Sequence, residues 1–311
     1  MAKKKAQRPQ QRKRRIPSER LSHVPPLHAV PRNSKGSLLI IGGNETKQVT
    51  NPILEELTAH IGRGKLVIAT FASNEPSPQW ERYRRLFKKM GVRRIEHLDA
   101  RSRDELMINP LEKITEGASA IFFGGGDQLK ITSRFGGTPT CEAIRKLYAA
   151  GAMIAGTSSG ASVMSETMLV AGDGDGSDNQ SLRMAPGLGF IPGVIIDQHF
   201  AERGRIGRLL AAVAQNPRLL GLGIDEDTAV HFDGDDRFRV LGAGAVYVVD
   251  GRNGTYSNIA EDSVSASSMH GMIVHVLTTA DTFDLTTRLP VAPPPKLKKA
   301  AVERAQESIA S

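Results

Sequence analysis

A five-residue stretch in the middle of the chain has the pattern of a serine nucleophile. Gly156-Thr157-Ser158-Ser159-Gly160 fits Gly-x-Ser-x-Gly and follows the short apolar run Met153-Ile154-Ala155. Between a strand and a helix, this pattern places the central serine on a tight turn, and side chains at the glycines would collide with their neighbours. The helix N-terminus then directs N–H groups and its positive dipole end toward an oxyanion beside Ser158. A loop that only caps a helix fits the same residues.

A serine nucleophile requires a base, and His199 is the histidine best placed to supply it. It stands at the polar end of the apolar run Val194–Gln198, so we expect its ring to reach the same sheet edge as Ser158. The other seven histidines lie near the N-terminus, lack a glycine turn or acidic cluster beside them, or fall in alternating β segments. A buried structural histidine is the alternative interpretation.

An acid that orients the base is expected in the run Asp225-Glu226-Asp227, directly after the apolar segment Gly221–Ile224. Three consecutive carboxylates repel one another and therefore need compensating partners. A solvated turn that caps a helix is the other interpretation. The order serine, histidine, acid, with each residue at a strand end, favours a catalytic triad.

Three arginines follow His199 within ten residues: Arg203, Arg205 and Arg208. A solvated helix face is the usual explanation of such a run. Here the arginines open a helix, where the dipole disfavours cations. A ligand carboxylate held by two parallel hydrogen bonds would explain their position.

The charge of the chain is concentrated at its ends. The whole chain has a net charge of +8, of which residues 1–35 contribute +10 and residues 290–311 contribute +2, so residues 36–289 carry −4. The single cysteine, Cys141, excludes an internal disulfide and is expected to be a small core residue of a helix. The sequence lacks a secretory signal and an apolar run of membrane-spanning length, which favours the cytoplasm.

Three segments are expected along the chain. Residues 1–33 are basic and almost without apolar residues before Leu21, which predicts a disordered extension. Residues 34–289 form the folded domain, and residues 290–311 form a Pro- and Lys-rich tail. Within the domain, residues 172–179 are read as a flexible loop.

The folded domain is predicted to be an α/β protein with a mostly parallel, doubly wound sheet and flanking helices. Short apolar strands alternate with helical segments, and such alternation places helical crossovers between parallel strands. The predicted strands are 37–41, 65–70, 94–98, 118–123 and 153–155; the predicted helices begin near Asn51, Pro78 and Thr140. Sites in such sheets gather at the carboxyl ends of strands, where Gly124–Gln128 and Gly156–Gly160 lie. From Ile224 onward the pattern becomes β-rich.

Four sequence blocks together resemble the cyanophycinase family of serine peptidases, which is related to dipeptidase E. The blocks are Gly124-Gly125-Gly126-Asp127-Gln128, Gly156 to Ser162, Asp197-Gln198-His199-Phe200 with its following arginines, and Gly223 to Ala229. The resemblance covers residues 36–285 and implies a class I glutamine-amidotransferase-like fold. It also implies hydrolysis of cyanophycin, a poly-aspartate with arginine on each β-carboxyl, to β-Asp-Arg dipeptides.

The resemblance assigns a role to each predicted site residue. Ser158 resembles the nucleophile, His199 the general base and Glu226 the orienting acid, and the oxyanion hole would use N–H groups of Ser159, Gly125 and Gly126. The substrate pocket would contain Gln128, Asp197, Gln198, Arg203, Arg205 and Arg208. No cofactor and no metal is expected, and the family suggests a homodimer. Ser159 departs from the alanine usual after the nucleophile, and the basic extension has no counterpart.

Two other functions remain open. A related peptidase would hydrolyse Asp-X or other isoaspartyl dipeptides. A protein without catalytic activity would bind nucleic acid through its basic extension. In an active enzyme, the same extension would act as a weak tether to nucleic acid or to a granule.

Overall fold

A five-stranded parallel sheet lies at the centre of the computed structural model, which describes residues 36–108, 111–170, 182–258 and 268–291. Its strands are β1 (Ser37–Ile41), β2 (Lys65–Ala69), β3 (Arg94–Leu98), β4 (Ala118–Phe123) and β5 (Met153–Thr157). They lie in the order β1-β5-β4-β2-β3, and every neighbouring pair is parallel. These are the strands predicted from the short apolar runs. The predicted disordered extension and the loop 172–179 lie outside the described residues.

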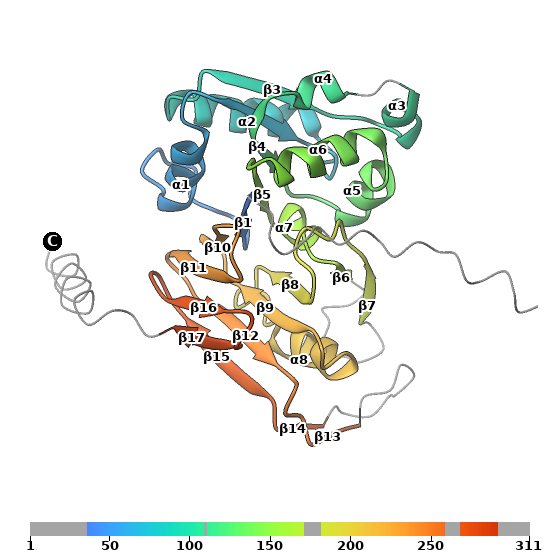
Figure 1. Cartoon of the computed structure of the whole chain (residues 1–311), viewed down its shortest axis with the longest axis vertical. Coiled ribbons are helices and arrows are strands. Elements are labelled where there is room, and N and C mark those ends of the chain that lie inside the picture. The colour runs from blue at the N-terminus through green and yellow to red at the C-terminus, as the bar shows by residue number, and fades with distance from the viewer. Residues whose placement is uncertain (1–35, 109–110, 171–181, 259–267, 292–311) are drawn as a thin grey trace, which may run out of the picture.

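Helices cover both faces of this sheet (Figure 1). α1 (Pro52–Ile61) and α2 (Pro76–Lys89) pack on one face with alternate strand residues such as Leu39 and Ile41. α5 (Gln128–Phe135) and α6 (Pro139–Ala149) pack on the other face, which receives Leu38 and Ile40. Two short helices, α3 (Arg103–Ile108) and α4 (Glu112–Thr115), precede β4. Because successive side chains of a strand point to opposite faces, strands buried on both sides are apolar throughout.

Local sequence signals account for the helix starts. The side chain of Asn51 accepts hydrogen bonds from the N–H groups of Ile53 and Leu54, as expected for a helix cap. α2 begins at Pro76, two residues before its predicted start, because proline is favoured in the first helical turn. Cys141 is buried in α6, and its burial raises the pKa of the thiol.

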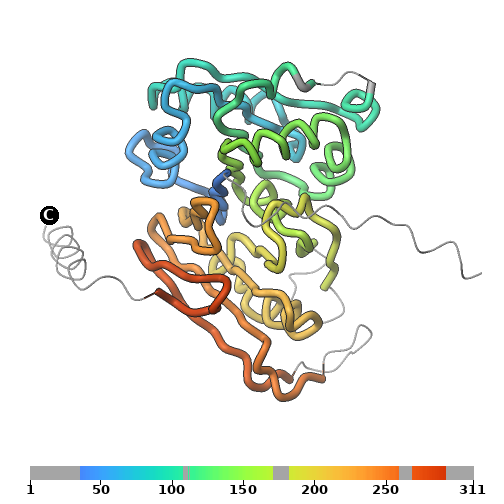
Figure 2. The backbone as a smooth tube through the Cα atoms, viewed as in Figure 1, coloured from blue at the N-terminus to red at the C-terminus, as the bar shows by residue number. Residues whose placement is uncertain are grey.

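The second half of the chain is β-rich, as predicted, and its yellow-to-red trace lies in the lower part of Figure 2. Four antiparallel strands extend the central sheet beyond β1 to nine strands: β10 (Thr228–Phe232), β11 (Arg237–Gly242), β16 (Thr282–Asp284) and β17 (Leu289–Val291). A separate four-stranded sheet contains β8 (Val194–Gln198), β9 (Leu220–Ile224), β12 (Val246–Asp250) and β15 (Ile273–Leu277). α8 (Ile206–Gln215) packs on β9 and β12 of this sheet. The α/β fold is confirmed, and its nine-stranded sheet is mixed.

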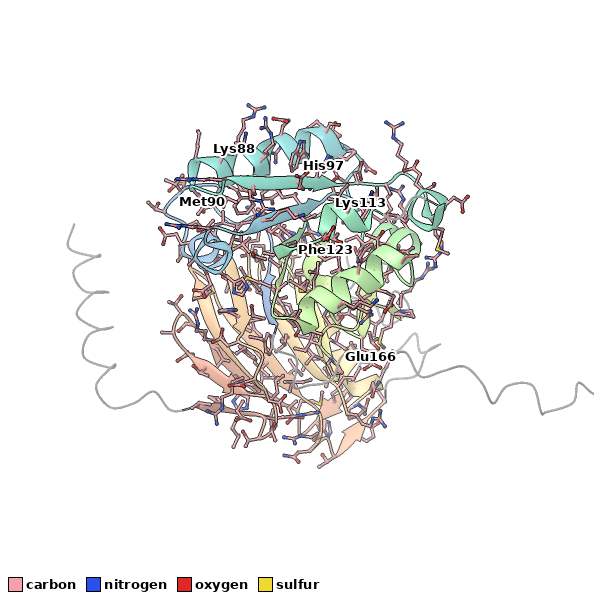
Figure 3. All side chains as sticks on the ribbon, turned by 45° about the horizontal axis from the view of Figure 1, so that its top comes forward. Lys88, Met90, His97, Lys113, Phe123 and Glu166 are labelled. Atoms are coloured by element: carbon pink, nitrogen blue, oxygen red, sulfur yellow. The ribbon has the colours of Figure 1, made fainter. Side chains whose placement is uncertain are left out.

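Two small hairpin-like sheets complete the described fold. They pair β6 (Thr167–Val170) with β7 (Arg183–Pro186), and β13 (Tyr256–Ser257) with β14 (Met269–His270). A four-residue helix, α7 (Ser159–Ser162), follows β5. Phe123 ends β4 in the interior, whereas Lys88 of α2 projects outward (Figure 3). Among the described helices, none combines the length and apolarity needed to cross a bilayer.

Candidate active site

Ser158 occupies a strained turn between β5 and α7. Its φ of 55° and ψ of −119° are rarely adopted by a residue with a side chain. The turn is tight enough to exclude side chains at both flanking glycines. A Cβ atom at Gly156 would overlap the carbonyl of Gly160, and one at Gly160 would overlap that of Phe123. The Gly-x-Ser-x-Gly pattern therefore forms the strand-turn-helix geometry expected from the sequence.

Three predicted residues form a continuous hydrogen-bonded chain. Ser158 Oγ lies 2.9 Å from His199 Nε2, and His199 Nδ1 lies 2.6 Å from Glu226 Oε1. The histidine ring is nearly buried, while the glutamate side chain is about a quarter exposed, at 27%. His199 follows β8 and Glu226 follows β9, so both come from the four-stranded sheet, whereas Ser158 follows a strand of the central sheet. The His199 ring thus reaches Ser158, as expected, although it comes from the four-stranded sheet and not from the sheet that carries the serine.

Each of the three consecutive acids has its own partners. Asp225 accepts hydrogen bonds from the N–H groups of Ala201 and Ala245. Asp227 accepts from the N–H and hydroxyl of Thr46 and from the side chain of Asn51. These contacts fix the crossover from β9 to β10 on both sides of Glu226. The repulsion expected within the acidic run is therefore compensated residue by residue.

The turn after β1 supports the histidine and the glutamate. The carbonyl of Gly42 accepts the N–H of His199 at 2.8 Å, and Gly43 lies directly against the imidazole ring. Asn44, whose φ is 46°, donates from Nδ2 to Glu226 Oε2 at 2.7 Å. Sequence reasoning missed these residues. Their signal was the glycine pair at the carboxyl end of a parallel strand, where sites gather in such sheets.

The electrostatic environment favours a neutral imidazole beside an ionised carboxylate. Burial lowers the pKa of His199, and Arg203 lowers it further, while the hydrogen bond with Glu226 opposes the shift. The hydrogen bond from Asn44 is the largest cause that lowers the pKa of Glu226, and the bond with His199 adds to it. At neutral pH, His199 Nε2 is therefore free to accept a proton from Ser158.

A glycine turn after β4 lies beside Ser158 and is held at both ends. Gly124 N–H donates to Ala69, and Asp127 N–H donates to Ala72. Two side chains hold its carbonyls: Gln79 Nε2 donates to Gly125 at 3.0 Å, and Ser159 Oγ donates to Gly126 at 2.5 Å. Gly125 is so close to the serine that a Cβ there would lie 3.2 Å from Ser158 Cβ.

Three backbone N–H groups near this turn have no acceptor among the described residues. They belong to Gly125, Gly126 and Ser159. Ser159 begins α7, where helical N–H groups lack internal partners. Ser159, which stands where alanine is usual, therefore leaves its N–H unpaired among these residues, while its hydroxyl donates a hydrogen bond to the carbonyl of Gly126.

The predicted substrate residues divide into a buried ionic group and more accessible side chains. Asp197 is buried and binds Arg205 Nη1 at 3.2 Å and Arg208 Nε at 2.8 Å. Burial lowers the pKa of Arg205 to about 10, which still leaves it charged at neutral pH. Arg203 is exposed, and it forms no ion pair with a described residue. Two of the three arginines therefore neutralise an internal carboxylate.

The two glutamines of the predicted pocket are held differently. Gln128 Nε2 donates to the carbonyl of Leu169 at 3.1 Å, and its Oε1 lies 3.2 Å from Ser159 Oγ. Gln198 is buried at the end of β8, and its Oε1 has no hydrogen-bond partner within the described part of the chain.

A cavity of about 590 Å³ opens beside the Ser158 hydroxyl, on the side of α2. Its described lining is Asn44, Glu45, Lys47, Ser73, Glu75, Pro78, Gln79, Arg82, Tyr83, Gly125, Thr157, Ser158, His199 and Glu226. This volume is typical of a site for a small molecule or a peptide unit. None of the six predicted substrate-binding residues belongs to this described lining. Among the described residues, no cluster of His, Cys, Asp and Glu side chains is arranged to hold a metal ion.

Residues 38–240 match the sequence profile of peptidase family S51. The chain belongs to this family. A protein from Nostoc sp. named cyanophycinase is 39% identical over 283 residues, which cover 87% of this chain and 94% of the relative. A cyanophycinase from Geminocystis herdmanii is 38% identical over 266 residues, which cover 83% and 97% of the two chains. The resemblance inferred from the sequence is therefore confirmed.

A solved structure shares the fold of this S51 peptidase. The crystal structure of a peptidase from an acI-B1 Actinobacterium aligns with a TM-score of 0.60 at 21% identity. The alignment covers 81% of this chain and 98% of the actinobacterial chain. The serine-peptidase class predicted from the motifs agrees with the family.

Proposed function

We propose that this S51 peptidase is a cyanophycinase, a serine exopeptidase that hydrolyses cyanophycin to β-Asp-Arg dipeptides through an acyl-enzyme. The observation that carries the proposal is the chain of hydrogen bonds from Ser158 through His199 to Glu226, with distances of 2.9 and 2.6 Å. It occurs in a chain that is 34–39% identical to proteins named cyanophycinase. Burial lowers the pKa of His199, so the expected general base is uncharged at neutral pH, as proton transfer from serine requires.

In the proposed mechanism, Ser158 Oγ attacks the α-peptide carbonyl of the poly-aspartate backbone. Its proton passes to His199 Nε2, and Glu226 stabilises the imidazolium through Nδ1–H. The N–H groups of Ser159, Gly125 and Gly126 would hold the oxyanion, which they can do without breaking a described hydrogen bond. The tetrahedral intermediate collapses as His199 returns the proton to the leaving amine. Water then attacks the ester by the same route, which releases the acyl product and restores Ser158.

We also propose a substrate pocket near Gln198, formed by the residues that the sequence predicted to bind substrate. Arg203, which has no ion-pair partner within the described ranges, would bind a substrate carboxylate. Arg205 and Arg208 would stabilise the pocket without binding the substrate themselves, because both already form ion pairs with the buried carboxylate of Asp197. Gln128 and Gln198 would supply neutral hydrogen-bonding groups. These roles are compatible with a substrate that carries both carboxylates and guanidinium groups.

The proposal also includes a cytoplasmic homodimer in which the basic residues 1–33 tether the enzyme weakly to an anionic surface. Removing residues 1–33 should leave turnover of short soluble substrates unchanged. It should abolish salt-sensitive adsorption to DNA or to isolated granules. Sedimentation of the truncated and full chains tests the dimer.

The central experiment is incubation of the purified full chain with cyanophycin, with the products identified by mass spectrometry. Wild type should release β-Asp-Arg, whereas Ser158→Ala should lose turnover by about six orders of magnitude. Ser162→Ala, a buried serine one helical turn away, is the matched control and should retain activity. Release of other products from Asp-X or isoaspartyl dipeptides, with cyanophycin left intact, would instead support the dipeptidase function. A Ser158→Ala variant with more than a few per cent of wild-type turnover would exclude Ser158 as the nucleophile.

A further inference from the structure

The cavity beside Ser158 on the side of α2 is lined by charged groups that the predicted substrate pocket does not include. One face of α2 contributes to it at helical spacing: Glu75, the residue that caps α2, then Pro78, Gln79, Arg82 and Tyr83. Residues three or four apart lie on the same helix face, so these side chains form a continuous wall. A substrate unit that enters this cavity from the attacked carbonyl would contact the wall.

Two charges of this wall have no ionic partner among the described residues. The carboxylate of Glu75 makes no capping hydrogen bond, and Arg82 forms no ion pair there, although both are exposed beside the cavity. The neighbouring arginines differ, because Arg84 and Arg85 pair with Glu81 of the same helix at 3.1 and 3.7 Å. The wall therefore presents one uncompensated anion and one uncompensated cation, separated by about 10 Å along the helix.

A third charge, that of Lys47, lines the cavity next to Tyr83 of this wall. Lys47 Nζ contacts Glu45 Oε1 at 2.6 Å, donates to the carbonyl of Glu45 at 2.7 Å, and lies 5.3 Å from the centre of the Tyr83 ring. The Glu45 side chain is fully buried, and it also accepts hydrogen bonds from Tyr83 and from Thr157, the residue before Ser158. Of the three N–H bonds of an ammonium group, two are used by Glu45 and one is left for a ligand.

The wall is tied to the turn next to the nucleophile. Gln79 lies between Glu75 and Arg82 on α2, and its Nε2 donates to the carbonyl of Gly125 at 3.0 Å. A ligand that contacts Glu75 and Arg82 is thereby placed against the turn beside Ser158. Binding energy on this wall acts directly on the position of the reacting carbonyl.

We propose that this cavity is a second substrate subsite, which binds an arginyl unit of the polymer on the α2 side of the scissile bond. Arg82 and Lys47 bind the free α-carboxylate of that unit, and Glu75 binds its guanidinium group. A purely anionic ligand would be repelled by Glu75, and a purely cationic ligand would be repelled by Arg82. The preferred ligand therefore carries both charges. The inference rests on the proposed function for the identity of the polymer, but it concerns residues outside the predicted pocket.

Binding is measured by calorimetry in the inactive Ser158→Ala background, so that the result does not depend on turnover. The ligand is a synthetic trimer of β-Asp-Arg, compared with one trimer whose arginine carboxylates are amidated and another in which citrulline replaces arginine. Arg82→Met should raise Kd for the trimer about tenfold and remove much of its preference for carboxylate over amide. Glu75→Gln should remove the preference for arginine over citrulline.

The matched controls are Arg84→Met and Glu81→Gln, which change the same residue types on α2 outside the described cavity lining. Both should bind all three trimers as the Ser158→Ala parent does. If Arg82→Met and Glu75→Gln bind the three trimers as these controls do, the proposed subsite does not exist, even if the enzyme hydrolyses cyanophycin. If wild type leaves cyanophycin intact, the proposed function is wrong, and the calorimetric comparison still decides the charge preference of the cavity.

Discussion

Replacement of Gly43 by alanine should displace the imidazole of His199. A Cβ atom at Gly43 would lie 2.6 Å from His199 Nε2 and 2.9 Å from Nδ1. Ordinary carbon contacts begin near 3.5 Å, so the ring or the turn must move by about 1 Å. A displacement of about 1 Å in a catalytic group costs on the order of 100-fold in rate. We therefore expect Gly43→Ala to lower kcat/KM about 100-fold and the rate of fluorophosphonate labelling of Ser158 to fall in parallel.

A matched glycine separates this effect from backbone strain. Gly43 has a φ of 113°, and Gly91, in the turn after α2, has a φ of 94° with no atom within 4 Å of a built Cβ. Gly91→Ala should therefore lose stability through strain, about 1–2 kcal/mol, while labelling and turnover stay at the wild-type level. Gly43→Ala should lose a further 1–3 kcal/mol or so from overpacking. Labelling of Gly43→Ala at the wild-type rate would refute the role of this contact in holding the ring.

Three further predictions concern charges near the site. Activity should rise with pH as His199 loses its proton, with a midpoint below the usual histidine value of about 6.5, since burial lowers the pKa of this ring. Glu226→Gln removes a group that raises that pKa, so the midpoint should move to still lower pH while the plateau falls; an upward move in the pH profile would contradict the assignment. Arg208→Ala should destabilise the fold by about 1.5–3 kcal/mol in urea titrations, because buried Asp197 loses both charged hydrogen bonds from Arg208 and keeps only Arg205 as an ionic partner. Unchanged stability with weaker substrate binding would instead favour a direct ligand contact.

Much of the fold follows from local signals in the sequence. Uninterrupted apolar runs such as Leu38 to Ile41 predict strands buried on both faces, and Asn51 and the prolines mark helix starts. The serine turn is only partly local, since Gly156 is required by the nearby carbonyl of Gly160 but Gly160 is required by the carbonyl of Phe123 on β4. The three residues of the hydrogen-bonded chain could be predicted from the order of their motifs along the sequence.

Other features depend on contacts between distant segments. The spacing of Asp197, Arg205 and Arg208 is compatible with both a ligand clamp and an internal ion group, and only the burial of Asp197 distinguishes them. The contact of Asn44 with Glu226 joins residues 182 positions apart. The division of the β-rich half into two sheets also depends on pairing between strands that are distant in the sequence. The residue pattern of one strand does not identify its partner strands.

Glu226 lies in the segment that connects the two sheets. The hydrogen bonds from Ser158 through His199 to Glu226 therefore depend on how the two sheets pack together. β9 belongs to the four-stranded sheet and β10 to the nine-stranded sheet, and only three residues separate them. Secondary structure within either sheet can persist while their mutual docking loosens, and such loosening separates Ser158 from His199 without melting a strand. The contact between Ser158 and His199 therefore requires correct docking of the two sheets, and neither sheet alone carries all three residues of the hydrogen-bonded chain.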